Sequence, residues 1–153
     1  MIRTLLSALA VAVLLLAGVP AVAAGPHDDL LKASDIEAAA GLTGVAGLER
    51  LSQPWAGGTL NFATAEGAPL LMVQVADASY YDQFHKAYHG GDLTLADAAF
   101  SGTIQPASTP NFVAFRKGVT CVTLTVFPDP SGTALPLDLA ALVRIAEVVA
   151  ARL

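Results

Sequence analysis

Apolar and polar residues alternate with a period of two from Asn111 to Phe127, and this is the clearest strand pattern in the chain. Lys117-Gly118 interrupts the alternation near its middle. Because glycine adopts positive φ without steric cost, the pattern predicts a β-hairpin that turns there. Side chains alternate between the two faces of a strand, so one face, centred on Val122, is core-like. The other face is mixed and carries Phe112, Ala114, Arg116, Val119, Cys121, Thr123 and Thr125.

The rest of the chain predicts helices and strands around this hairpin. A second hairpin has strands at 59–64 and 70–76, and weaker strands are expected at 48–52 and 98–100. Ser34 and Glu37 match a capping box that begins a short helix. A second helix is expected from Tyr80 to His89, stopped by two glycines, and a third closes the chain. We therefore expect an α+β fold with an antiparallel sheet of about five to six strands and three helices.

The two hairpins resemble each other in sequence. Asn61-Phe62 and Asn111-Phe112 lie ahead of the glycines at the two turns, and apolar triplets follow them: Leu71, Val73 and Val75 after Gly67, and Val122, Leu124 and Val126 after Gly118. This similarity has two explanations. The chain is either a doubled α-β-β-β unit with a closing helix, or it contains two unrelated hairpins that alternate alike.

The first 24 residues have the order of a secretory signal peptide. One positive charge precedes an apolar run over 5–16, and a helix break and small residues follow. We expect cleavage after Ala23 or Ala24, a flexible lead over 25–33, and a single α+β domain over 34–153. The expected location is periplasmic or secreted, without stable membrane insertion after cleavage. The alternative is an uncleaved anchor, because residues 5–24 are long enough to span a bilayer.

Charge and composition narrow the function classes. The chain has 153 residues with 8 basic and 13 acidic side chains, and cleavage after Ala24 would leave a net charge of −6. Such a chain has no electrostatic basis for binding nucleic acid. A single cysteine excludes an internal disulfide. No catalytic motif occurs, so we assign no catalytic residues, expect no cofactor, and favour a protein that is not an enzyme.

Asp82, His85 and His89 form the strongest candidate metal site. On a helix, residues three and four apart are neighbours, so these side chains can share one edge. Two histidines at this spacing can bind one metal ion. The alternative is a solvated helix flank.

Trp55, Phe112 and Thr123 are the candidate residues for binding a partner or ligand. Trp55 lies in a loop between proline and glycines, and the other two lie on the mixed hairpin face. If that face is open, its apolar residues predict an interaction site. If it is covered, Cys121 is buried, which we favour because an exposed lone thiol would oxidise after export.

These observations predict an exported, non-catalytic binding module for a protein partner or a small apolar ligand. Two alternatives stay open: an enzyme or metal-carrying accessory protein built on the histidine edge, and a structural component of the envelope. The segments Asp97–Phe100 (DAAF) and Phe115–Gly118 (FRKG), with the export signal and the order of elements, resemble small uncharacterised exported bacterial α+β proteins. This resemblance covers most of the chain after the leader and implies a fold without a known activity.

Overall fold

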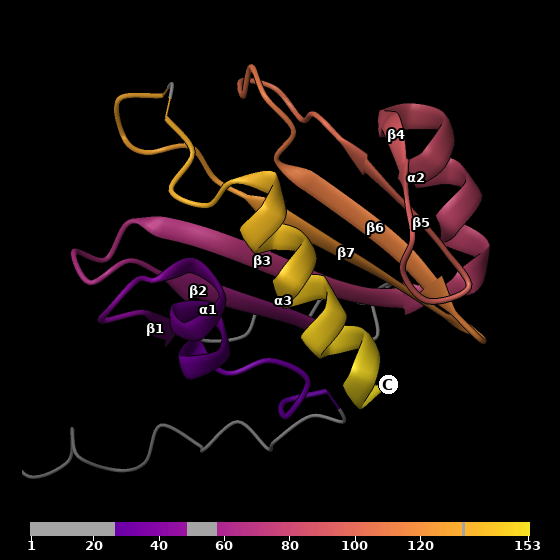
Figure 1. Cartoon of the computed structure of the whole chain (residues 1–153), viewed down its shortest axis with the longest axis horizontal. Helices are drawn as coiled ribbons and strands as arrows, with labels where there is room; N and C mark the ends of the chain where they lie inside the picture. The colour runs from indigo at the N-terminus through magenta and orange to yellow at the C-terminus, as the bar shows by residue number, and fades with distance from the viewer. Residues whose placement is uncertain (1–26, 49–57, 133) are drawn as a thin grey trace, which may run out of the picture.

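The computed structural model describes residues 27–48, 58–132 and 134–153 (Figure 1). The expected signal peptide and Trp55 lie outside these residues. The described elements are α1 (Ala33–Ala40), β1 (Ala46–Leu48), β2 (Gly58–Ala63), β3 (Pro69–Asp77), the 3-10 helix η1 (Ala78–Tyr80), α2 (Tyr81–Tyr88), β4 (His89–Leu93), β5 (Ala98–Gly102), β6 (Phe112–Lys117), β7 (Thr120–Val126) and α3 (Leu139–Arg152).

Among the described residues, seven strands form one antiparallel sheet in the order β1-β2-β3-β7-β6-β5-β4. The α+β class and the three α-helices agree with the prediction. The sheet has more strands than expected, because β4 occupies the segment that was predicted to end a helix. No helix in the described part of the chain is long and apolar enough to cross a membrane.

The hairpin of β6 and β7 keeps the predicted faces but turns one residue later than predicted. Gly118 has φ 58° and takes the first central position of the turn, with Val119 after it. A turn at Lys117-Gly118 would pair Phe115 with Thr120, whereas the observed turn pairs Phe115 with Val122. A shift of the pairing by two residues leaves every side chain on its predicted face. Val119 is the exception, because it lies in the turn and is 81% exposed.

The two similar triplets lie on neighbouring central strands. β3 and β7 pair antiparallel: Leu71 with Val126, Val73 with Leu124, and Val75 with Val122. The first residue of each triplet thus pairs with the last residue of the other, and the two middle residues, Val73 and Leu124, pair with each other. Phe62 and Phe112 do not correspond, because they belong to the cores on opposite sides of the sheet. The helices also break the relation, since α1 and α2 contribute to different cores.

Helices cover the sheet on both sides. The larger core lies between one sheet face and the helices α1 and α3, and Figure 1 shows α3 crossing the strands with α1 beside it. A smaller core on the other face combines Tyr81 and Phe84 of α2 with Phe100, Phe112 and Cys121. Because α2 packs on this second face, the β4–β7 end of the sheet is the middle layer of three.

The N-terminal capping box predicted around Ser34 is wrong. The helix α1 begins earlier, and the Asp35 carboxylate accepts a hydrogen bond from the Lys32 backbone N–H at 2.8 Å. Glu37 instead accepts from the backbone N–H of Val45 at 3.0 Å and holds the loop after α1. The Arg152 guanidinium donates to both Asp35 carboxylate oxygens, at 2.6 and 2.9 Å, and so ties α3 to α1.

Candidate functional site

The junction of α2 and β4 gathers two of the three predicted metal-site residues. His85 lies in the last turn of α2, and His89 is the residue at which the helix ends and β4 begins. Their spacing of four places both imidazoles on one helix edge, and the ring centroids are 4.3 Å apart. A Cβ atom on Gly102 would lie 1.9 Å from the Tyr88 carbonyl oxygen, so only glycine allows the end of α2 to approach β5 this closely.

A β-bulge adds an acidic group to this junction. The pairing of β4 with β5 shifts at Gly90, which is an extra residue in β4. In a regular strand, residues three apart point to opposite faces. Because of the bulge, His89 and Asp92 lie opposite Gly102 and Phe100, which are two residues apart and share one face. Both side chains therefore project on the same side of the sheet as α2.

The three side chains are close enough to bind one ion. One ligand atom from each of His85, His89 and Asp92 can be chosen so that all lie within 4.8 Å of one another. Within this group, His89 Nε2 and Asp92 Oδ1 are 2.9 Å apart. We refer to these three residues as the His-His-Asp corner.

Buried rings hold the imidazoles in place. The Phe100 ring is fully buried, and its centroid lies 5.0 Å from that of His85 in an edge-on arrangement and 5.7 Å from that of His89. Tyr81 also lies beside His85, with ring centroids 6.1 Å apart, and its ring packs edge-on against Phe100 at 5.6 Å. The Asp92 side chain is 87% exposed. The corner thus has an apolar base of buried rings, a half-buried His85, and an exposed His89 and Asp92.

Asp82 is exposed and is not part of this group. Asp82 lies on α2 three residues before His85, as the sequence indicates, but the structure brings Asp92 to the histidines instead. Sequence reasoning missed Asp92 because two glycines after His89 indicate the end of a helix. The same glycines could have indicated a bulge followed by an edge strand.

The mixed hairpin face is covered, so it is not the open surface that would make Phe112 and Thr123 ligand contacts. Both residues are 2% exposed, and Cys121 is fully buried, as we favoured. Burial in these apolar surroundings raises the pKa of the Cys121 thiol to about 11. Phe112 packs against Phe84 and Tyr88 of α2. Phe112 and Thr123 therefore belong to a buried core and are not part of an exposed surface.

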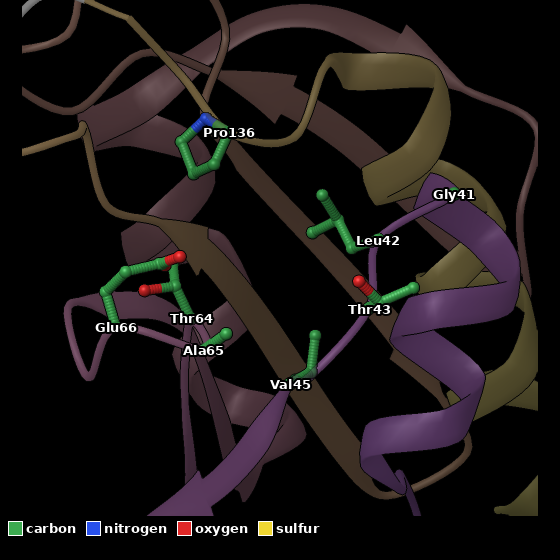
Figure 2. Close-up of a pocket in the computed structure, with 8 residues that line it drawn as sticks. All are labelled: Gly41, Leu42, Thr43, Val45, Thr64, Ala65, Glu66 and Pro136. Atoms are coloured by element: carbon green, nitrogen blue, oxygen red, sulfur yellow. The ribbon is translucent and has the colours of Figure 1, made fainter.

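A pocket of about 270 Å³ opens between the loop after α1 and the β2–β3 turn (Figure 2). Thr64, Ala65 and Glu66 face Leu42 and Thr43 across the hollow. The two loops approach closely because the residue between Thr43 and Val45 is a glycine with φ 74°, whose added Cβ would lie 2.8 Å from that of Ala65. The pocket mixes hydroxyl, carboxylate and apolar groups.

A second hollow, of about 380 Å³, lies where β3 begins and β7 ends. Four prolines and one aromatic ring dominate its lining, and we call it the proline groove. The lining residues are Ala68, Pro69, Pro106, Phe127, Pro128, Asp129, Pro130 and Gly132.

No known protein family, curated protein or solved structure was found to match this chain. Its function is therefore inferred from the chemistry of its own residues.

Proposed function

We propose that this protein is an exported, non-catalytic binding module and that its ligand is a small apolar molecule held in the proline groove. The observation that carries the proposal is the lining of the groove, which is almost wholly apolar and open to solvent. Ligand sites in proteins are mostly apolar hollows of roughly 300–1,000 Å³. The groove, at about 380 Å³, falls within that range, whereas the pocket between the loop after α1 and the β2–β3 turn, at about 270 Å³, does not.

The wall of the groove is rigid before any ligand arrives. Proline fixes its own φ angle, so it loses little conformational freedom on binding. The Phe127 backbone N–H donates to the Leu70 carbonyl at 3.0 Å, which anchors the backbone of this residue to the central sheet. The Asp129 carboxylate accepts from the Ser131 hydroxyl and from the Gly132 backbone N–H and so closes the loop beyond it. A preformed apolar wall favours a small rigid apolar ligand.

A neutral fluorescent apolar probe, N-phenyl-1-naphthylamine, tests the proposal. We expect saturable binding of one probe molecule to the purified protein. Phe127→Ser removes the aromatic wall and should weaken binding by about tenfold, corresponding to about 1.4 kcal/mol of lost contact. Pro130→Asp adds a charge at the exposed rim and should weaken binding without disturbing the core. Val119→Ser is the matched control, because Val119 is an exposed apolar residue in the distant β6–β7 turn.

The proposal fails if the probe does not saturate, or if Val119→Ser weakens binding as much as Phe127→Ser. Export is tested separately by the intact mass of the protein recovered outside the cytoplasm. That mass should correspond to a chain that begins at Ala24 or Gly25. Recovery of the whole chain in a membrane fraction would support the uncleaved anchor.

A further inference from the structure

We propose that the His-His-Asp corner binds one divalent transition-metal ion, with His85, His89 and Asp92 as its protein ligands. This site shares no residue with the proline groove, so the two proposals stand independently. Two imidazole nitrogens and one carboxylate oxygen are the donor set of many zinc sites, and they also suit cobalt, nickel and copper. Three protein ligands leave at least one coordination position for water or another molecule.

The geometry requires only small side-chain movements. With bonds of roughly 2.0–2.2 Å to the metal, tetrahedral ligand atoms lie about 3.4 Å apart. The nitrogen of His89 and the oxygen of Asp92 are 2.9 Å apart and would separate by about half an ångström. The widest spacing in the group, within 4.8 Å, would close by up to about 1.4 Å. Rotation of side chains is sufficient, because His89 and Asp92 are exposed and free to adjust toward the half-buried His85.

Two backbone features bring the three side chains together, and a solvated helix flank would need neither of them. The bulge at Gly90 turns Asp92 toward the helix, and Gly102 allows the end of α2 to lie against β5. The two imidazoles also rest on the buried Phe100 ring, which limits their freedom before an ion binds. Less conformational entropy is then lost on binding. A hydrogen bond between His89 and Asp92 would be given up, and exposed ion pairs of this kind contribute about 0–1 kcal/mol.

Zinc titration of the purified protein, followed by calorimetry, tests the site. We expect one Zn²⁺ per chain, and Co²⁺ should give the visible absorption of a four-coordinate ion. His85→Ala and His89→Ala should each weaken Zn²⁺ binding by more than about 100-fold, beyond the 10–100-fold effect of changes outside the ligand set. Asp92→Asn should weaken it by at least about tenfold and should fold normally, because that side chain is exposed.

Two control variants separate this site from unspecific binding. Asp82→Asn changes an exposed carboxylate on the same helix, and His27→Ala removes the one histidine outside the corner. Neither should change the affinity for Zn²⁺. The proposal is overturned if the parent shows no saturable binding, if Asp92→Asn binds as tightly as the parent, or if His27→Ala weakens binding as much as His85→Ala. The last result would assign the ion to the N-terminal segment.

Discussion

The buried thiol of Cys121 provides a sensitive probe of whether α2 covers the second sheet face. Thiol reagents attack the thiolate, and burial raises the pKa of Cys121 from 9.0 to about 11. Near pH 8, this shift alone reduces the thiolate population by about 100-fold. The side chain is also fully buried, so a reagent must wait for the structure to open. Every 1.4 kcal/mol of opening free energy slows labelling by about another tenfold.

The assay compares the labelling rate of the native protein with that of the denatured protein at about pH 8. We expect native Cys121 to react at least about 100 times more slowly. Phe84→Ala removes a ring that α2 contributes to the smaller core and should accelerate native labelling. Asp82→Asn, an exposed change on the same helix, should not. Native labelling within tenfold of the denatured rate would refute the reasoning, as would equal rates for the two variants.

The same pKa predicts how stability depends on pH. A thiol whose pKa is higher in the folded state contributes stability below its unfolded value of 9.0, and loses that contribution as pH rises toward about 11. A shift of this size corresponds to about 3 kcal/mol of the free energy of unfolding. Burial also raises the pKa of Tyr81, which acts in the same direction. Denaturant unfolding between pH 8 and 11 should therefore show a smaller decline in a Cys121→Ala variant than in the parent.

Four further substitutions test the packing and the Asp35–Arg152 pair. Gly102→Ala places a Cβ atom 1.9 Å from a helix carbonyl oxygen and should cost about 3 kcal/mol of unfolding free energy. Gly47→Ala is the control, because its added Cβ atom meets no atom within 4 Å. Equal denaturation midpoints for the two variants would show that the end of α2 relaxes freely. Val122→Asp and Thr123→Asp should each cost at least about 3 kcal/mol, because both side chains are buried, and a well-tolerated Thr123→Asp would mean that the second face is open. Asp35→Asn should cost about 1 kcal/mol near neutral pH. In the parent, the hydrogen bonds from Arg152 hold the Asp35 pKa below 3.8. The parent should therefore lose the same stability as pH falls below that value. An Asp35→Asn variant with the parent's free energy of unfolding would show that the pair contributes nothing.

Alternation made the central strands predictable from sequence. Val73 and Leu124 sit in regular runs of period two, and both are fully buried where β3 meets β7. The exact turn of the last hairpin was less predictable, because either neighbour of Gly118 can complete a two-residue loop. The error moved Phe115 from one partner to another on the same face. Face assignments thus survive a pairing error of two residues.

The strand β4 was not predictable by the same reasoning. Its two glycines have low strand propensity and match a helix stop, so the local sequence predicts a helix that ends at His89 and is stopped by Gly90 and Gly91. Long-range pairing with β5 overrides that local preference. Because the predicted helix edge ended at His89, the candidate metal site was completed with Asp82, which precedes the histidines, instead of Asp92, which follows them.

The covering of the second face depends on tertiary packing that alternation does not report. The mixture of Phe112, Cys121 and Thr123 is compatible with either an interface or a modest core. The position of α2 decides the matter, and α2 could have packed on either side of the sheet. The aromatic rings that α2 contributes to the smaller core show on which side of the sheet this helix packs.

The bulge at Gly90 also affects how copies of this protein behave toward one another. Within the described residues, β4 is an outer strand of the sheet, and an outer strand offers unpaired backbone groups to strands of other molecules. An extra residue, two adjacent glycines and an exposed aspartate make this strand a poor template for such pairing. The backbone irregularity that brings His89 and Asp92 together therefore also discourages edge-to-edge aggregation. A change that removed the bulge and made β4 regular would separate the side chains of His89 and Asp92. It would also leave a regular edge strand that can pair with strands of other molecules.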